Sequence, residues 1–293
     1  MSGSFQFTAP TPLAFFASLV ADDANLLLIE AAASIAQDDQ PTLDIQTVLA
    51  ELDVMADKLQ RRVPADAVAV QRLRLLNRYF FQELGFAGNV NNYYDPQNSY
   101  LHSVLKTRRG IPITLALVYI ELACQIGLKA SGVSFPGHFL VKLRMPTGDR
   151  LGDVVLDPFT GQSLSRETLD GLLQPYRRQH GLLGDFVKPI GLFLQTTSPR
   201  EVLARMLRNL KEIYRSAQDW PRLLAVQERL VTLLPQAWEE RRDRGLAFAE
   251  MHRFAEALAD LEAYLESGAD AVDHVAVRSR TAELRQAGRP RLH

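Results

Sequence analysis

The sequence contains a single cysteine, Cys124, among its 293 residues. One cysteine permits no disulfide within the chain and excludes any metal site built from several thiolates. A chain of this length can bury a sizeable core without covalent cross-links. Because the absence of disulfides fits a reducing compartment, we expect a cytoplasmic protein.

Long apolar runs and a basic N-terminus are also lacking. No apolar run approaches the roughly 20 residues that a membrane helix needs, so we expect no membrane association. The apolar stretch PLAFFASLVA, residues 12–21, has no Lys or Arg before it and is followed at once by Asp22 and Asp23. A secretory signal begins with positive charge, and we therefore expect no secretion.

An excess of charge of one sign is missing, since the net charge is −1. Such a chain has no general attraction for phosphate backbones. Arg-rich stretches such as EERRDRG, residues 239–245, carry interleaved acids and are typical of solvated helix faces. The six histidines show no metal-binding spacing, and no Gly-rich phosphate loop occurs. We expect no nucleic acid, metal or cofactor.

The first 128 residues are rich in helical patterns. Residues 12–85 contain many Ala and Leu, and apolar residues recur at spacings of three and four over residues 45–59. Residues 86–110 indicate a long loop with a short helix near 99–105. A strongly apolar helix is predicted to begin at or near Pro112, where proline is well tolerated, and to end at Gly127.

The apolar pattern then shortens. Three apolar runs at residues 129–135, 138–145 and 151–159 are separated by Pro-Gly and by PTGD, residues 146–149. These features predict antiparallel strands, with PTGD as a hairpin connection. A helix is expected to follow near residue 163, where SLSRETLDGLL begins with Ser, Thr and acidic residues.

An internal repeat marks the last third of the chain. A 34-residue offset pairs Tyr214 with Phe248 and Trp220 with Phe254. Residues 204–235 and 238–269 each predict two amphipathic helices with tetratricopeptide-repeat spacing, and residues 272–288 predict a capping helix. Two repeats are fewer than the three usually needed alone, so we expect this tail to dock on the N-terminal domain. The predicted domains are therefore residues 1–197 and 198–293.

Three elements carry the residues of a catalytic triad, with one member in question. His138 opens the second predicted strand after Pro-Gly, and Asp157 ends the third. A helix and two adjacent strands can bring a nucleophile, a base and an orienting acid together. Asp157 could accept a hydrogen bond from one ring nitrogen of His138, whose other nitrogen would face the start of the helix at Pro112.

Several motifs, taken in order, resemble the transglutaminase-like superfamily and its bacterial branch with a tetratricopeptide tail. They are NYYDPQNSYLHSVLKTRRGIPITLALVYIELACQIGL, FPGHFLVKL and LDPFTGQSLS. The resemblance covers about residues 45–290. It implies an α+β papain/transglutaminase-like core, with helices packed on a small antiparallel sheet, followed by an α-helical tail. It also implies that active members perform acyl transfer or peptide hydrolysis with a Cys on the helix and His and Asp on the strands.

The sequence departs from this pattern at the nucleophile. In active members Gly-x-Cys begins the helix, and here Gly-Ile-Pro stands in its place, with Pro112 at the cysteine position. Proline has no nucleophilic atom and no backbone N–H for an oxyanion hole. Cys124 lies twelve residues further on, which is about 18 Å along a helix, and we expect it to be buried and inert. Thr114 is nearer, but a threonine nucleophile needs a terminal amine or a strong base.

Two interpretations of His138 and Asp157 remain open. They form a structural hydrogen bond that pins the helix to the sheet, or they line a binding groove that persists from the old cleft. The groove hypothesis predicts a concave polar pocket lined also by Asn92, Tyr93, Asp95 and Arg109. The loop NNYYDPQNSY has an alternative interpretation, in which its side chains satisfy the local backbone. Arg109 could pair with a nearby carboxylate or bind an anion.

We therefore expect a non-catalytic scaffold that binds a protein or peptide through the tail and the remnant cleft. The alternative is a hydrolase or acyltransferase that uses His138 and Asp157 with Thr114 or with an activated water.

Overall fold

The computed structural model describes residues 10–147, 150–182, 188–268 and 273–287. These residues form two compact units. The described parts of Met1–Leu27, Gln37–Thr42 and Leu207–His293 form one, which we call the helical unit. Leu28–Ala36 and Leu43–Met206 form the other, which we call the sheet unit.

The sheet unit is built around four antiparallel strands in the order β3-β4-β5-β6. They are β3 Lys129–Phe135, β4 His138–Thr147, β5 Arg150–Asp157 and β6 Gln162–Ser163. The three strands predicted from the short apolar runs are confirmed. β3 and β4 meet at the Pro-Gly turn, where Gly137 has a φ of 72° that glycine adopts without steric cost. The predicted PTGD connection lies partly outside the described residues.

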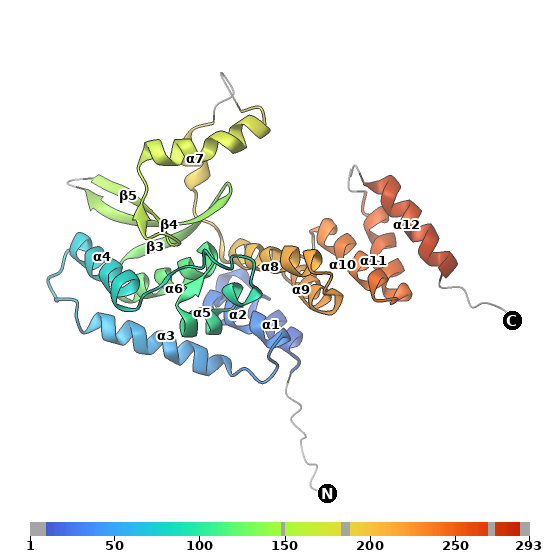
Figure 1. Ribbon diagram of the computed structural model, residues 1–293, viewed down its shortest axis with the longest axis horizontal. Helices are drawn as coiled ribbons and strands as arrows, with labels where there is room; N and C mark the ends of the chain where they lie inside the picture. Colours follow the sequence, from blue (N-terminus) through green and yellow to red (C-terminus); the bar gives the residue numbers. More distant parts are fainter. Residues whose placement is uncertain (1–9, 148–149, 183–187, 269–272, 288–293) are drawn as a thin grey trace, which may run out of the picture. The chain divides into compact units, whose positions relative to one another are not determined.

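Helices cover both faces of this sheet, with α6 on one face and α7 on the other (Figure 1). The remaining elements of the unit include a short parallel strand pair, β1 with β2. The bounds are α2 Leu28–Ser34, α3 Ile45–Gln60, α4 Ala69–Asn77, the π-helical turn η3 Arg78–Glu83, β1 Ala87–Gly88, η4 Pro96–Ser99, α5 Leu101–Thr107, β2 Arg109–Gly110, α6 Pro112–Gln125, α7 Arg166–Gln179 and η6 Ile190–Leu194.

The alternation of side chains along the strands divides the core of the sheet unit into two layers. Val133, Leu140 and Val155 pack with Leu169 and Leu173 of α7. Their neighbours in sequence point to the opposite face, against which α6 packs. α6 is buried along most of its length, which explains why its sequence is apolar on nearly every side.

The helical unit contains the predicted repeat. Its elements are α1 Pro12–Leu19, η1 Asp23–Asn25, the later part of α8 Pro199–Ser216, α9 Trp220–Leu233, α10 Trp238–Glu250, α11 Phe254–Glu266 and α12 His274–Ala287. A Cβ at Gly245 would lie 3.0 Å from Leu261, so α10 and α11 approach closely at this small residue, as the repeat spacing predicts.

The N-terminal helix α1 belongs to the helical unit and packs on α9. Phe16 is fully buried, and the Arg229 guanidinium lies 4.8 Å from the centre of its ring. The division into two compact units therefore differs from the predicted domains in two ways. Residues 10–27 and 37–42 belong to the helical unit, and the later boundary between the units falls inside α8. An apolar helix pattern indicates that a helix is buried but not which partner buries it. The predicted boundary at residues 197 and 198 stays a prediction.

None of the helices within the described ranges is long and apolar enough to span a membrane.

Candidate functional site

The start of α6 lies beside the turn that follows β5, with β1 between them. Asn89 N donates a hydrogen bond to Gly110 O at 3.1 Å, and Gly88 N donates to Phe159 O at 3.0 Å. A Cβ at Gly88 would lie only 2.3 Å from the Phe159 ring, so this close approach requires glycine. The turn that follows Asp157 is therefore close to the start of α6.

The Asp157 carboxylate binds within its own turn. One oxygen accepts a hydrogen bond from Phe159 N at 2.8 Å, and the other accepts from Thr160 Oγ1 at 3.0 Å. Gly161 N closes the turn by donating to Asp157 O at 2.8 Å. In the part of the chain that the structure describes, the His138 ring makes no hydrogen bond to this carboxylate. The described structure therefore lacks the His138–Asp157 hydrogen bond that was expected to pin the helix to the sheet. The Asp157 carboxylate instead stabilises the turn that follows β5.

His138 is half-buried at the first position of β4, opposite Phe135. The two ring centres are 6.4 Å apart. Strand alternation places His138 on the same face as Leu140, and Asp157 on the same face as Val155, which is the face covered by α7. The two candidate residues thus share one face of the sheet, but α6 packs against the other face. The imidazole would have to reach the first turn of α6 around the end of β4.

Arg205 holds the turn that precedes His138, and sequence analysis did not identify it. Its Nη1 donates to Ser134 Oγ at 2.5 Å, and its Nη2 donates to His138 O at 2.7 Å. The guanidinium also lies 5.5 Å from the centre of the Phe139 ring. Burial lowers the pKa of this guanidinium from its ordinary value. No local signal could have found this residue, because its partners lie about 70 positions away in the sequence.

The loop before α5 is organised by Asn98, a second residue that sequence analysis missed. Asn98 is buried, and its Nδ2 donates to Asn92 O at 2.6 Å and to Tyr93 O at 3.2 Å. Its Oδ1 accepts from Asn89 Nδ2 at 2.9 Å. The abundance of Asn in this stretch was the available signal, since Asn side chains often bind the local backbone.

The residues of this loop that were predicted to line the pocket also form hydrogen bonds within the loop. Asn92 Nδ2 donates to Asp95 Oδ2 at 3.0 Å, and Asp95 Oδ1 accepts from Gln97 N at 2.9 Å, which caps η4. Tyr93 is exposed, and its ring centre lies 6.0 Å from that of Phe159. The loop and the Asp157 turn are therefore neighbours, while Asn92 and Asp95 serve the loop's own backbone and side chains.

Arg109, the predicted basic residue of the groove, binds backbone instead of acids. Its Nη1 donates to Gly85 O at 2.6 Å and to Arg108 O at 2.9 Å. Within the described ranges it forms no ion pair with Asp95 or Asp157. Arg109 therefore links β2 to Gly85, which follows η3.

Comparison with known families identifies the fold around this site. A family model described as the transglutaminase-like superfamily matches residues 46–208. The chain belongs to the transglutaminase-like superfamily. A tetratricopeptide-repeat model matches residues 210–282, which confirms the expected fold of an α+β core followed by a helical repeat tail. No solved structure matches the chain.

This transglutaminase-like protein also has relatives that it matches over most of their length. It is 38% identical to a UPF0162 protein of Xylella fastidiosa, over 84% of this chain and 85% of the relative. It is 30% identical to a UPF0162 protein of Pseudomonas aeruginosa, over 88% of this chain and 90% of the relative. It is 26% identical to Protein SirB1 of Salmonella typhimurium, over 78% and 80% of the two chains.

The first turn of α6 in this transglutaminase-like protein begins with Pro112, directly after the N-cap residue Ile111. Thr114 is fully buried, and its hydroxyl donates to Asn98 O at 2.6 Å and lies 3.1 Å from Ile111 O. The hydroxyl therefore contacts two backbone carbonyls, one in η4 and one at the N-cap of α6. Within the described ranges, no three His, Cys, Asp or Glu side chains are grouped to hold a metal ion.

Cys124 is exposed, which corrects the expectation of a buried thiol. It lies in the last turn of α6, where the helix reaches solvent although its sequence neighbours Leu122 and Ala123 are buried. Partial desolvation by its surroundings raises the thiol pKa above its ordinary value. The negative charge of Glu121 adds to this effect, and a backbone hydrogen bond from Ala130 opposes it.

This pKa shift makes a prediction about alkylation. Because the thiolate is the reactive form, a raised pKa leaves less thiolate at pH 7–8. We expect Cys124 to react with iodoacetamide several-fold more slowly than a cysteine-containing peptide at pH 7.5, with a rate midpoint at higher pH. Rates measured from pH 6 to 10 test this, with Cys124→Ser as the blank. A midpoint at or below that of the peptide would contradict it.

Proposed function

We propose that this protein is a non-catalytic cytoplasmic scaffold that binds a protein or peptide. The observation that carries the proposal is Pro112 at the first position of α6, where the superfamily pattern places its cysteine nucleophile. A thiolate at a helix N-terminus gains from the helix dipole, whereas proline offers neither a nucleophile nor an N–H. Acyl transfer through a covalent intermediate has no attacking atom at this position.

The other candidate nucleophiles support the same proposal. The Thr114 hydroxyl is buried and committed to backbone carbonyls, so a substrate carbonyl cannot reach it. Cys124 lies at the opposite end of α6, about 18 Å along the axis from Pro112. The strand register also places His138 on the face of the sheet opposite α6.

The proposal that the protein binds a protein or peptide rests on two features. They are an exposed, largely aromatic loop surface and the tetratricopeptide repeats. Val90, Tyr93 and Tyr94 are exposed on the loop beside the Asp157 turn, and Tyr94 is 77% exposed. The Tyr93 and Tyr94 rings pack edge to face, with centres 5.3 Å apart. Tyrosine is favoured in protein interfaces because it offers a large, semi-rigid apolar surface with one polar group. Tetratricopeptide repeats supply a second surface of a kind that binds proteins.

A turnover assay tests the absence of catalysis. We expect no hydrolysis or acyl transfer when the full chain is incubated with a panel of peptide amides, glutamine peptides with amines, thioesters and esters. His138→Ala should leave this background unchanged. Turnover by the wild type that disappears in His138→Ala, with the same melting temperature, would contradict the proposal and favour the activated-water alternative.

A cysteine variant tests the assignment of the nucleophile position. The exposed Cys124 would itself react, so Pro112→Cys is made together with Cys124→Ser. If residue 112 occupies the nucleophile position, the new thiol at the helix N-terminus should react with iodoacetamide at least tenfold faster at pH 7 than a free cysteine peptide. A rate no faster than that of the peptide would remove the observation on which the proposal rests.

The binding half is tested separately, by selection from a displayed peptide library on the immobilised full chain. We expect a recurring peptide motif whose affinity falls at least tenfold in Tyr94→Ser. Selection of no motif, or binding unaffected by Tyr94→Ser and by deletion of residues 210–293, would contradict it.

A further inference from the structure

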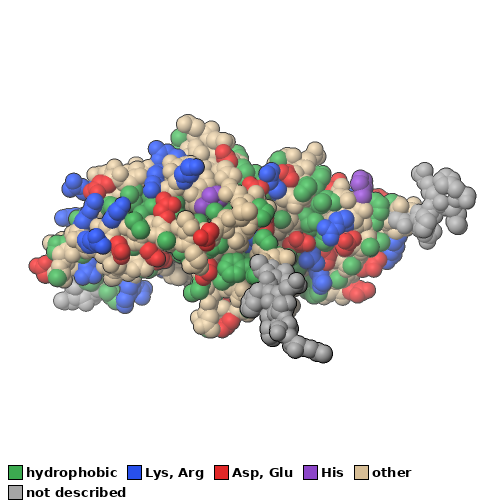
Figure 2. Space-filling view, turned by 90° about the horizontal axis from the view of Figure 1, so that it is seen from below, with side chains coloured by type: hydrophobic (Ala, Val, Ile, Leu, Met, Phe, Trp, Pro, Cys, Tyr) green, Lys and Arg blue, Asp and Glu red, His purple; other side chains and the backbone are tan. Residues whose placement is uncertain are grey.

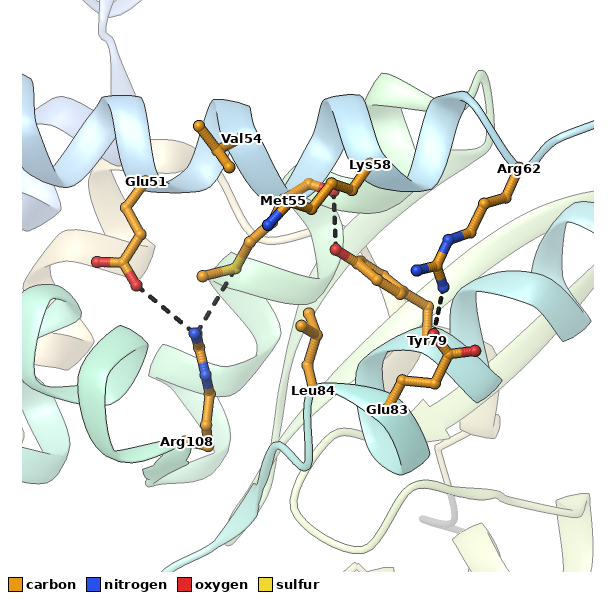
Figure 3. A pocket seen from close by; sticks show the side chains of 9 residues that line it. All are labelled: Glu51, Val54, Met55, Lys58, Arg62, Tyr79, Glu83, Leu84 and Arg108. Carbon is orange, nitrogen blue, oxygen red and sulfur yellow. Dashed lines mark hydrogen bonds and ion pairs between the residues drawn. The ribbon is translucent and has the colours of Figure 1, made fainter.

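The sheet unit contains a cavity of about 370 Å³ that none of the proposed scaffold contacts uses. It lies between α3, the turn η3 and the residue that follows α5 (Figure 3). Cavities of roughly 300–1,000 Å³ are typical of small-molecule sites. The volume is therefore sufficient for a compact organic ligand.

One part of the cavity wall is apolar. Met55 and Leu84 line it together with Val54, whose side chain is half exposed on α3. The Tyr79 hydroxyl points toward the backbone of α3 and donates to Met55 O at 3.2 Å (Figure 3). Burial raises the pKa of Tyr79 above its ordinary value, which is already high enough to keep the phenol neutral near pH 7. This wall suits the hydrocarbon or aromatic body of a ligand.

The charged part of the wall has a surplus cation. Lys58, Arg62 and Arg108 face the two acids Glu51 and Glu83. Glu83 is already held by Arg62 and, from outside the cavity, by Arg78 at 3.4 Å. Among the described residues, Lys58 has no carboxylate within ion-pair distance. Figure 3 shows its ammonium group directed over Met55, toward the half of the cavity that contains Arg108.

Arg108 is held in place without a tight acidic partner. Its guanidinium lies 4.8 Å from the centre of the Phe86 ring, and its Nη1 lies 3.6 Å from Met55 Sδ. The nearest oxygen of Glu51 is 3.6 Å from Nη2, which is longer than a charged hydrogen bond. Its backbone adopts the left-handed conformation, with a φ of 59°, which glycine would adopt more readily. Arg108 is therefore held in a strained backbone conformation, and its guanidinium keeps N–H donors available for a ligand.

We propose that this cavity binds a small organic monoanion, a carboxylate carried on an apolar or aromatic body. The carboxylate lies between Lys58 and Arg108, and the body lies on Val54, Met55 and Leu84. A dianion such as phosphate is disfavoured because two acids line the same cavity, whereas a single negative charge matches the surplus of one cation.

The surrounding surface is consistent with this charge balance. Figure 2 shows Lys and Arg side chains interspersed with Asp and Glu on its left part, where α3 lies. Recognition of the anion must therefore come from the cavity itself. The proposal is independent of the scaffold function, because none of the exposed loop residues Val90, Tyr93 and Tyr94 lines the cavity.

Methyl NMR of the full chain tests the proposal through a reporter inside the cavity. The chain has five methionines, and the Met55 thioether touches Arg108. In protein labelled with ¹³C-methyl methionine, we expect benzoate to shift the Met55 signal, assigned through Met55→Leu, in a saturable way. The fully buried Met206 serves as the reference and should not shift. Benzamide, which keeps the ring but lacks the charge, and acetate, which lacks the ring, should bind at least tenfold more weakly.

Two variants separate recognition from general electrostatics. Lys58→Gln and Arg108→Gln should each weaken benzoate binding about tenfold, the size of one lost charged hydrogen bond. Arg78→Gln removes a cation near the cavity that does not line it and should change the affinity less than twofold. Lys58 is exposed, so its variant should fold, and unchanged methyl signals outside the cavity check this. Absence of a saturable shift, equal binding of benzamide, or full affinity in Lys58→Gln would overturn the proposal.

Discussion

Replacing Glu240 with glutamine is expected to lower the free energy of unfolding of the helical unit by about 3 kcal/mol. Glu240 is 4% exposed and bridges α8 to α10. One carboxylate oxygen accepts from Arg208 Nε at 2.7 Å, and the other accepts from Lys211 Nζ at 2.6 Å. A glutamine of the same size would direct an amide N–H₂ toward one of these cations.

The size of this effect follows from the burial of Lys211, which is 7% exposed. Breaking a buried ion pair costs about 3–5 kcal/mol, because the remaining charge stays desolvated. Lys211 also contacts Asp243, with Nζ and Oδ2 2.5 Å apart. Since this second carboxylate remains in the variant, we expect the lower end of the range.

Tryptophan fluorescence measures this effect selectively during urea denaturation. Both tryptophans of the chain, Trp220 and Trp238, lie in the helical unit. Glu262→Gln is the control, because Glu262 pairs with Arg285 at 2.9 Å and the two side chains are 39% and 60% exposed. An exposed pair contributes less than about 1 kcal/mol. If Glu240→Gln and Glu262→Gln cost the same, the network does not stabilise the unit as described.

The secondary structure was readable from the sequence because each local pattern agrees with its surroundings. The short apolar runs form β3, β4 and β5, and the tail repeat forms two helix pairs with Gly245 at a close contact. α6 begins at Pro112 as predicted, since proline lacks only an N–H that the first turn leaves free. Patterns of this kind depend on neighbours within a few residues.

The details of the candidate site were less predictable because they depend on distant contacts. Asn98 holds the loop before α5 together through hydrogen bonds to its backbone. Arg205, about 70 residues away in the sequence, binds the turn before His138. Cys124 was expected to be buried because its neighbours are apolar, but the last turn of α6 turns it outward. The binding of the Asp157 carboxylate within its own turn did not follow from the order of the motifs.

The second large effect is a loss of stability expected for Asp38→Ala. This variant removes the ion pair between Asp38 and Arg229 of α9. Arg229 donates from Nε and Nη2 to the two oxygens of Asp38, at 2.5 and 2.8 Å. The Arg229 side chain is only 1% exposed, and its Nη1 is buried without a hydrogen-bond partner in the described structure. Removal of Asp38 would leave a desolvated guanidinium, and we expect a loss of about 3–5 kcal/mol by the same fluorescence measurement.

The neighbouring ion pair, whose arginine is half exposed, supplies the control for Asp38→Ala. Asp39, the next residue, pairs with Arg222 at 2.5 Å, but the Arg222 side chain is half exposed. Asp39→Ala is therefore expected to cost less than about 1 kcal/mol. Similar losses in the two variants would mean that burial of Arg229 does not determine the effect.

A double variant distinguishes the cost of an unpaired charge from the loss of an attractive contact. Methionine at position 229 keeps much of the side-chain length and can still pack on Phe16, while it removes the charge that Asp38 neutralises. Because buried ion pairs are often replaced by apolar groups without loss, Asp38→Ala with Arg229→Met should regain at least about 2 kcal/mol over Asp38→Ala alone. If the double variant is as unstable as the single one, Asp38 stabilises the helical unit through contacts other than its pairing with Arg229.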